Sequence, residues 1–533
     1  MSSLGAELRG ADGTPPCPPP AGAPLNTGGD APDTDAHHRE LRTDHLLENI
    51  GQRTVRGGIL VFAAQGIKVL AQFGAVVVLA RLLPPAAFGL VAMIGALYAM
   101  LDPIREFGLS FATIQKPDLT HAQVSTLFWI NVALGWLVGS ALFLAAPLIA
   151  AFYGQPELTA VTRWVALGFF ATGACAQHWA LLRRQMRFGA VAALETSIEL
   201  ISFAVAIVAA LEGAGYWALV AHRLTGAVLL LIGCWTLCRW RPSRPSLVPG
   251  IGELLSYGGS LTGTTMVGLL SRSVDQVMIG WFWGASALGL YERAAKLLML
   301  PLNNIVIPLY TVGVPSLSRL VTDQQRYRHA FGQMLEKLAM ITVPAAALIA
   351  VTADWTTAVL FGPQWSSAAP VVACFAIVAA YQPSIHVMGL LYMTQMRAAE
   401  LVRASMLDAA ISIVTVLCSL PYGTTAVAAA FAVTGLFMRT PLSYWLATRH
   451  GPVKLAQIYT SMLPSAVAGC AVVAAIWALR RFIVPAETAP LMGLAIAAPT
   501  AVLAAGVVFC LVPRSRHGLI GFMSAGRLIF GGA

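Results

Sequence analysis

Apolar runs separated by short polar connections fill the chain from about residue 57 to residue 512. Each run has about 20 residues, the length that an α-helix needs to cross the hydrocarbon core of a bilayer. The chain does not show the strict alternation over about 10 residues that is typical of a membrane β-barrel. About fourteen spans are predicted, at residues 57–82, 86–108, 124–151, 159–181, 190–211, 215–238, 254–282, 286–312, 333–361, 368–392, 401–420, 424–446, 460–479 and 489–512. The pattern therefore predicts an all-α polytopic membrane protein.

The composition supports this fold class, because 57% of the residues are hydrophobic and only 11% are charged. The formal net charge of +10 comes from Lys and Arg in the connections, which indicates membrane topology and contact with anionic lipid and no nucleic-acid partner. These cations gather in every second connection, at Lys116, Arg183, Arg184, Arg187, Arg239, Arg241, Arg244, Arg319, Arg326, Arg328, Arg397, Arg449, Lys454, Arg514 and Arg516. By the positive-inside rule, both termini are predicted to be cytoplasmic. Arg480 and Arg481 break the pattern, because they fall on the predicted outer side.

The two ends of the chain and its cysteines carry no predicted site. Residues 1–48 are rich in Pro, Gly and Ala and predict a disordered cytoplasmic tail, and residues 518–533 predict a second cytoplasmic tail. The first segment does not have the pattern of a secretory signal, because no apolar core follows Met1. The eight cysteines lack the spacing of a disulfide framework or a metal site, so neither a metal nor a cofactor is expected.

Four short matches recur in the same order in the two halves of the chain and indicate an internal duplication. They pair Gly89-Leu90 with Gly289-Leu290, Tyr153-Gly154 with Phe361-Gly362, Gln185-Met186-Arg187 with Gln395-Met396-Arg397, and Thr225-Gly226 with Thr434-Gly435. The repeated unit contains six spans, so both units cross the membrane in the same direction around an axis along the membrane normal. The predicted domains are six-helix bundles over 49–244 and 245–450, followed by two additional helices over 451–517.

Polar side chains interrupt the opening spans of both units and predict a substrate cavity between the halves. The candidates are Gln65, Lys68, Gln72, Arg272, Asp275, Glu292, Arg293 and Lys296. The first three share one helical face, because their spacing is i, i+3, i+7. A different interpretation remains open for two pairs, which are spaced to form ion pairs that only stabilise helix packing. These pairs are Arg272 with Asp275 and Glu292 with Lys296.

Three acids within the spans predict a second kind of site, one that couples transport to an ion. Glu195 and Glu199 lie one helical turn apart, and two carboxylates so placed repel each other unless a proton or a sodium ion joins them. Asp408 stands opposite Glu199 at an offset of 209 residues. The alternative is that these acids form ion pairs with arginines at the cytoplasmic ends of the spans, such as Arg187 or Arg403.

Catalytic signatures are missing from the sequence. There is no GxxxxGK[ST] loop for an internal ATPase, and no HExxH, CxxC or GxSxG motif. No predicted outer connection is long enough for the catalytic region of a membrane glycosyltransferase. The chain is therefore not expected to be an enzyme.

Three stretches resemble the polysaccharide transporter family within the multidrug/oligosaccharidyl-lipid/polysaccharide exporter superfamily. They are VDQVMIGWFWGASALGLYERAAKLLMLPLNNI at 274–305, EFGLSFATIQKPDLTHAQVSTLFWIN at 106–131, and the repeated landmarks YGQPEL and FGPQW. The similarity covers about residues 55–450. The resemblance implies two six-helix bundles that form a V around a central cavity, with two extra helices in some members.

The resemblance also implies a function, that of a flippase for oligosaccharide repeat units carried on polyprenyl diphosphate in the bacterial inner membrane. Lys68, Arg272, Arg293 and Lys296 would hold the diphosphate or acidic sugars. The expected partners are this lipid-linked oligosaccharide, membrane lipids, and polymerase and export proteins of exopolysaccharide, capsule or O-antigen assembly. Two other functions remain open, a cation-coupled multidrug antiporter of the same fold and a membrane glycan polymerase.

Overall fold

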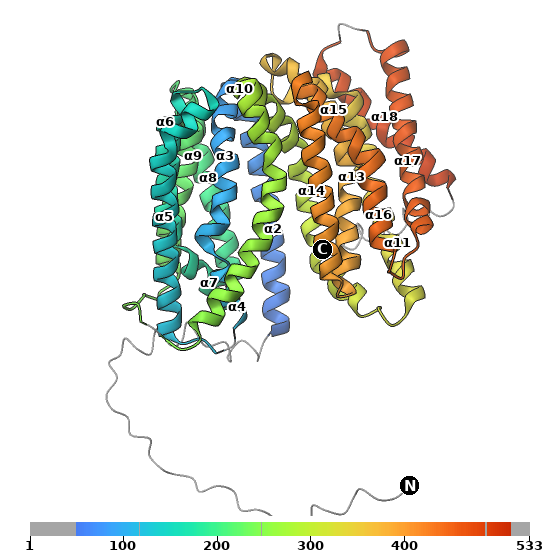
Figure 1. The fold of residues 1–533 in the computed structure, drawn as a ribbon. Coiled ribbons are helices and arrows are strands. Elements are labelled where there is room, and N and C mark those ends of the chain that lie inside the picture. The colour runs from blue at the N-terminus through green and yellow to red at the C-terminus, as the bar shows by residue number, and fades with distance from the viewer. Residues whose placement is uncertain (1–49, 117, 247, 486–487, 513–533) are drawn as a thin grey trace, which may run out of the picture.

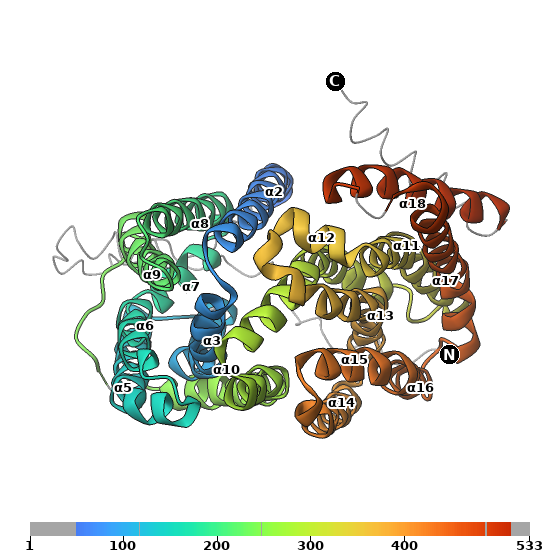
Figure 2. The same cartoon turned by 90° about the horizontal axis from the view of Figure 1, so that it is seen from above.

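The computed structural model describes residues 50–116, 118–246, 248–485 and 488–512. Side chains are described in these ranges except at 50–64, 264, 267, 268, 270–272, 303, 305–308, 311 and 312. All regular elements in the described ranges are helices, which stand side by side in two groups (Figures 1 and 2). The predicted tails over 1–48 and 518–533 lie outside the described residues.

The first half of the chain forms one group of helices. It contains α2 (Ile50–Leu82), α3 (Pro85–Glu106), α4 (Leu109–Gln115), α5 (His121–Tyr153), α6 (Glu157–Gly173), α7 (Ala176–Arg184), α8 (Phe188–Leu211) and α9 (Trp217–Leu237). The ends of α5 illustrate how local sequence sets these bounds. Thr120 and Gln123 form a capping box at its start, and Gly154 ends the helix in the left-handed conformation.

The long helix that opens the second half packs against α3 of the first group as well as against helices of its own half. The rest of the second half forms the other group, and the last two helices lie at its outer edge (Figure 2). The elements of the second half are α10 (Ile251–Ser318), α11 (Gln324–Val351), α12 (Ala353–Leu360), η2 (Pro363–Ala368), α13 (Ala369–Thr394), α14 (Ala398–Ser419), η3 (Leu420–Tyr422), α15 (Thr424–Thr434), η4 (Gly435–Arg439) and α16 (Thr440–Thr448). The additional helices are α17 (Leu455–Ala478), η5 (Leu479–Ile483) and α18 (Pro490–Leu511). α17 packs along α11 and against α18.

The helix α10 contains two of the predicted spans and folds back on itself at Gly284, whose φ is 78°. The hydroxyl of Tyr291 donates to the Asp275 carboxylate at 2.9 Å. A continuous helix would place these residues about 24 Å apart at 1.5 Å per residue, so the two arms of α10 lie against each other.

The expected span count stays a prediction. Among the described residues, 11 helices are long and apolar enough to cross a membrane. A twelfth span results if α6 and α7, which are bent by 44°, form one. The arms of α10 are not among these helices.

The duplication is confirmed in the backbone geometry. Met186 and Met396, which match in the sequence, have φ values of 54° and 57°, a conformation that is uncommon for a residue other than glycine. The side chains that follow them behave alike, since Arg187 donates to the Leu237 oxygen at 2.8 Å and Arg397 donates to the Ala447 oxygen at 3.0 Å. These contacts repeat at the same offset of 210 residues.

The two halves meet where another matched pair crosses. A Cβ added to Gly89 would lie 1.6 Å from the Ala285 oxygen, and a Cβ added to Gly289 would lie 2.0 Å from the Pro85 oxygen. These contacts are reciprocal at an offset of 200 residues, as contacts around a twofold axis must be. The pseudo-twofold axis therefore passes near this crossing of α3 and α10.

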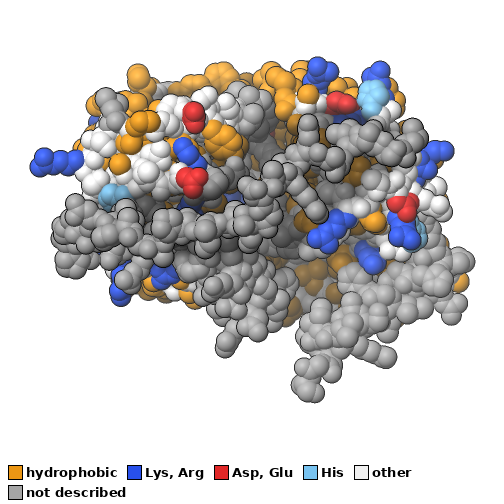
Figure 3. Space-filling view, turned by 90° about the horizontal axis from the view of Figure 1, so that it is seen from below, with side chains coloured by type: hydrophobic (Ala, Val, Ile, Leu, Met, Phe, Trp, Pro, Cys, Tyr) orange, Lys and Arg blue, Asp and Glu red, His pale blue; other side chains and the backbone are white. Residues whose placement is uncertain are grey.

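The face seen from below carries Lys and Arg side chains on both halves (Figure 3). The connections from α7 to α8, from α9 to α10 and from α13 to α14 end on this side, and they contain predicted cytoplasmic cations. The distribution fits the positive-inside rule with this face in the cytoplasm.

Candidate functional site

A polar ladder joins α2 to α8 inside the first half. Lys68 Nζ lies 2.9 Å from Glu195 Oε2, and Gln72 donates to Glu199 at 2.9 Å. Both contacts have a sequence separation of 127 residues, so the two helices run parallel and the contacts repeat once per turn. Each acid of the repelling pair thus has a donor on α2.

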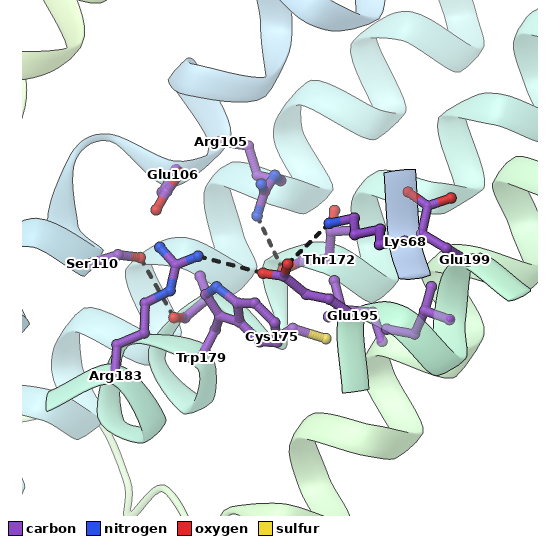
Figure 4. Close-up of a pocket in the computed structure, with 14 residues that line it drawn as sticks. Lys68, Arg105, Glu106, Ser110, Thr172, Cys175, Trp179, Arg183, Glu195 and Glu199 are labelled. Carbon is purple, nitrogen blue, oxygen red and sulfur yellow. Dashed lines mark hydrogen bonds and ion pairs between the residues drawn. The ribbon is translucent and has the colours of Figure 1, made fainter. Parts of the chain in front are cut away.

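A cavity of about 400 Å³ opens beside the lower end of this ladder (Figure 4). Its walls include Lys68, Arg105, Glu106, Arg183, Glu195 and Glu199. Arg183 from α7 approaches Glu195 at 3.7 Å, so this carboxylate faces two cations. Arg105 is held elsewhere, because it pairs with Asp102 at 2.8 Å and donates to the Thr172 oxygen at 3.0 Å.

A second cavity of about 280 Å³ lies between α2, α3, α8, α9 and α10. The Glu292 carboxylate, which is buried, pairs with Arg293 at 3.1 Å and with Lys296. The Arg293 guanidinium also lies over the Phe88 ring, 4.0 Å from its centroid. A third cavity of about 230 Å³ adjoins the other two, and Glu199 lines all three.

The lining of the three cavities has an excess of positive charge. The cations are Lys68, Arg105, Arg183, Arg223, Arg293 and Lys296, and the acids are Glu106, Glu195, Glu199 and Glu292. Even when Arg105 is set aside because Asp102 neutralises it, five cations face four carboxylates. Such an interior is mixed in charge and suits an anionic ligand.

The structure brings together five of the eight predicted cavity residues: Lys68, Gln72, Glu292, Arg293 and Lys296 line the cavities. Gln65 instead donates to Asn304 on the second arm of α10 at 2.9 Å. Asp275 lies between the arms of α10, bonded to Tyr291, and lines none of the three cavities. The side chain of Arg272 lies outside the described residues.

The three candidate coupling acids have different surroundings. Glu195 pairs with Lys68 and Arg183, whereas Glu199 has the neutral Gln72 and, at 3.8 Å, His222. In the other half, Arg439 donates to both oxygens of the Asp408 carboxylate at 2.7 and 2.8 Å.

Sequence reasoning missed Arg223, which lines two cavities and lies over the Tyr98 ring at 5.6 Å. The signal was available, since a charged residue within an apolar span is costly unless it faces a polar interior. Arg183 was predicted only as a topology signal. Its approach to Glu195, like the approach of His222 to Glu199, depends on helix packing, which the sequence does not state.

Near the upper side of the molecule lies a set of contacts that we call the upper closure, formed between Ala80–Leu83 at the end of α2 and residues 359–365. The Trp365 indole and the Gln364 amide both donate to the Ala80 oxygen at 2.7 Å. In the opposite direction, Arg81 donates to the oxygens of Val359 and Leu360. The last carbonyls of a helix have no partners within it, so these donors cap α2 across the two halves.

The upper closure contacts residues that line the second cavity. The Phe88 ring packs on Trp365, with centroids 5.5 Å apart, and its other neighbour is the Arg293 guanidinium. A ligand that moves Arg293 would therefore disturb the support of Trp365.

Solved structures of membrane transporters share this fold, in which the helices stand in two groups. The structure of "Lipid II flippase MurJ, inward closed conformation" superposes with a TM-score of 0.67 at 12% identity, over 85% of this chain and 99% of that one. The family model described as "Polysaccharide biosynthesis protein" matches residues 78–370, more than half of the chain. The chain belongs to this family.

Two relatives have similar sequences over part of their length. One is "Lipopolysaccharide biosynthesis protein WzxC" of Escherichia coli, 25% identical over 60% of this chain and 65% of the relative. The other is "Teichuronic acid biosynthesis protein TuaB" of Bacillus subtilis, 28% identical over 52% of this chain and 57% of the relative. The matched regions thus span less than two thirds of these relatives.

Proposed function

We propose that this protein is a flippase that moves polyprenyl-diphosphate-linked oligosaccharide repeat units across the bacterial inner membrane, for exopolysaccharide, capsule or O-antigen assembly. The observation that carries the proposal is the net positive lining of the internal cavities, at Lys68, Arg183, Arg223, Arg293 and Lys296. A diphosphate offers these cations charge-assisted contacts. Family membership and the polysaccharide functions named for the two relatives support the same reading.

The mechanism is differential binding without covalent chemistry. The diphosphate leaves the lower side, displaces the internal pairs of Glu195 and Glu292, and binds Lys68, Arg293 and Lys296 in their place. Binding shifts the equilibrium toward a second conformation only by the difference in affinity between the two states. Arg293 lies over the Phe88 ring, and Phe88 packs on Trp365. Through these two contacts, the binding of the diphosphate to Arg293 changes the stability of the upper closure.

The test is transport of a fluorescent polyprenyl-diphosphate oligosaccharide in proteoliposomes, read by the fraction that an outside enzyme or quencher can reach. The expected result is a rate well above that of protein-free vesicles. Equal rates with and without the protein would overturn the proposal. Competition by the same lipid without its diphosphate should be weak, since the cations are the proposed contact.

We further propose that Glu199 is the ion-coupling acid, if transport is driven by an ion gradient. Its neighbours are the neutral Gln72 and His222, and it lines all three cavities, whereas Glu195 and Asp408 face cations directly. Glu199→Gln should abolish the response of transport to an imposed pH or sodium gradient and leave gradient-free flipping. A full gradient response in Glu199→Gln and its loss in Asp408→Asn would place coupling in the other half.

The proposed orientation has both termini in the cytoplasm and the upper closure on the outer side. The cations on the lower face and the positive-inside rule support it. Under this proposal the substrate enters from the inner leaflet and meets polymerase and export proteins at the outer surface. Labelling of an N-terminal tag in sealed, right-side-out vesicles would contradict the orientation.

A further inference from the structure

The additional hairpin formed by α17 and α18 contacts the second half through a charged side chain near the upper end. α17 is followed by the π-helical turn η5, which carries Arg480. The Arg480 guanidinium donates to both oxygens of Asp354 at 3.0 and 2.5 Å and to the Val351 oxygen at 2.6 Å. It also lies over the Trp355 ring, 4.3 Å from the centroid.

These partners place Arg480 at the junction of two helices. Val351 is the last residue of α11, and its oxygen is one of the carbonyls that a helix end leaves without a partner inside the helix. Asp354 lies in the first turn of α12. A cation at this point fits the negative end of α11 and binds the start of α12 at the same time. The Trp355 ring also packs against α18, where a Cβ on Gly493 would lie 2.8 Å from it.

The helix α12 leads directly to the upper closure. It has 8 residues and is followed by Gly362, whose φ of 94° turns the chain into η2. Gln364 and Trp365 of η2 then cap α2. Because a short helix moves as a unit, the contact that fixes its start also fixes the position of the closure at its end.

We propose that Arg480 is a positioning residue of the upper closure, through which the α17–α18 hairpin stabilises the conformation that is closed on this side. The inference rests on the proposed function, since an alternating-access transporter requires a closure that opens and forms again. It also accounts for a cation that breaks the positive-inside pattern, because Arg480 has specific partners at this end of the molecule.

The test is hydrogen exchange, followed by mass spectrometry, of the full chain in lipid nanodiscs without substrate. The peptide over residues 360–368 reports opening of the closure, and a peptide from α14 serves as the reference. In Arg480→Ala, the exchange rate in 360–368 should rise about three- to tenfold relative to the wild type. The reason is that a half-exposed ion pair with additional hydrogen bonds stabilises the closure more than a surface pair does and less than a buried pair does. The α14 peptide should not change.

The matched control is Arg481→Ala. Arg481 lies in the same π-helical turn and carries the same charge, but it is exposed, and no contact of its side chain is found among the described residues. Its exchange should equal that of the wild type. If Arg480→Ala does not fold, Asp354→Asn takes its place. This variant removes the carboxylate and keeps the hydrogen bond from Arg480 to the Val351 oxygen, so a smaller rise in exchange is expected.

Two outcomes would overturn the positioning role: wild-type exchange in both Arg480→Ala and Asp354→Asn, or an equal rise in Arg481→Ala. The measurement needs no substrate, so it separates this inference from the proposed function. A protein that fails to flip lipid-linked oligosaccharide and still shows the Arg480 effect would refute the flippase and leave the positioning role in place.

Discussion

Replacement of Lys68 distinguishes a cation that binds substrate from one that only holds two helices together. Lys68→Met removes the charge and keeps an unbranched chain of similar length in α2. Glu195 then retains only Arg183, at 3.7 Å. The second member of the test is Glu195→Gln. The third is the double variant, which removes both charges of the Lys68–Glu195 pair and leaves Arg183 without Glu195.

The size of the effect on stability follows from the geometry of the pair. At 2.9 Å and an effective dielectric constant of about 20, two unit charges attract by about 6 kcal/mol before desolvation is counted. The side chains are 20% and 31% exposed, which places the pair between a buried one and a surface one. Lys68→Met alone should therefore lower the free energy of unfolding by about 1–3 kcal/mol. The double variant should recover most of that loss, because the one charge that remains of the three, Arg183, has a side chain that is 44% exposed.

Transport should behave differently from stability. If Lys68 binds the diphosphate, the double variant folds well and still flips the lipid-linked oligosaccharide about tenfold to a hundredfold more slowly, the loss expected for one hydrogen bond to a charged group. The assays are unfolding monitored by scanning fluorimetry and flipping in proteoliposomes at equal protein density. Wild-type transport in the double variant would refute the binding role and leave Lys68 as a packing residue.

Three further predictions concern other parts of the molecule. Trp365→Phe removes the indole donor to Ala80 and should cost about 1–2 kcal/mol of stability. Trp477→Phe alters an exposed ring and should have little effect in the same thermal scan. Asp408→Asn leaves the buried Arg439 without its carboxylate and should lower the free energy of unfolding by about 3 kcal/mol. The control is Asp323→Asn, which keeps its helix cap and loses only a solvent-exposed pair with Arg326. Its loss should be less than about 1 kcal/mol. Gly89→Ala should abolish the yield of monodisperse protein in detergent, while Gly66→Ala, whose Cβ meets nothing within 4 Å, should give the wild-type yield; a normal yield of Gly89→Ala would contradict the described crossing.

The fold was accessible from the sequence because the bilayer imposes a strong pattern. Apolar run length alone predicted the helices, and four short matches predicted a duplication that reappears as backbone geometry at Met186 and Met396. The break at Gly284 falls in the predicted connection between the spans at 254–282 and 286–312. The bond between Asp275 and Tyr291 adds what the sequence did not show, that the two arms lie against each other.

The candidate site was predictable in its residue types and not in its pairing. Spacing within one helix correctly suggested the contact of Glu292 with Lys296. Lys68 had no partner within its own helix, and its contact with Glu195 comes from a helix 127 residues away. Likewise, the expected partners of the acids were Arg187 or Arg403, whereas the structure pairs them with Lys68, Arg183 and Arg439. Ion pairs between different helices depend on how the helices pack, and the sequence alone does not show this packing.

The crossing of Gly89 with Gly289 bears on how the halves move. Most helix contacts interlock side chains, and a rotation there requires many of them to leave one packing arrangement for another. At this crossing, backbone meets backbone without side chains between them. A rotation of one half against the other at this contact therefore requires little repacking of side chains. Because it lies by the pseudo-twofold axis, a small rotation there becomes a large displacement at the distant lower ends of both halves.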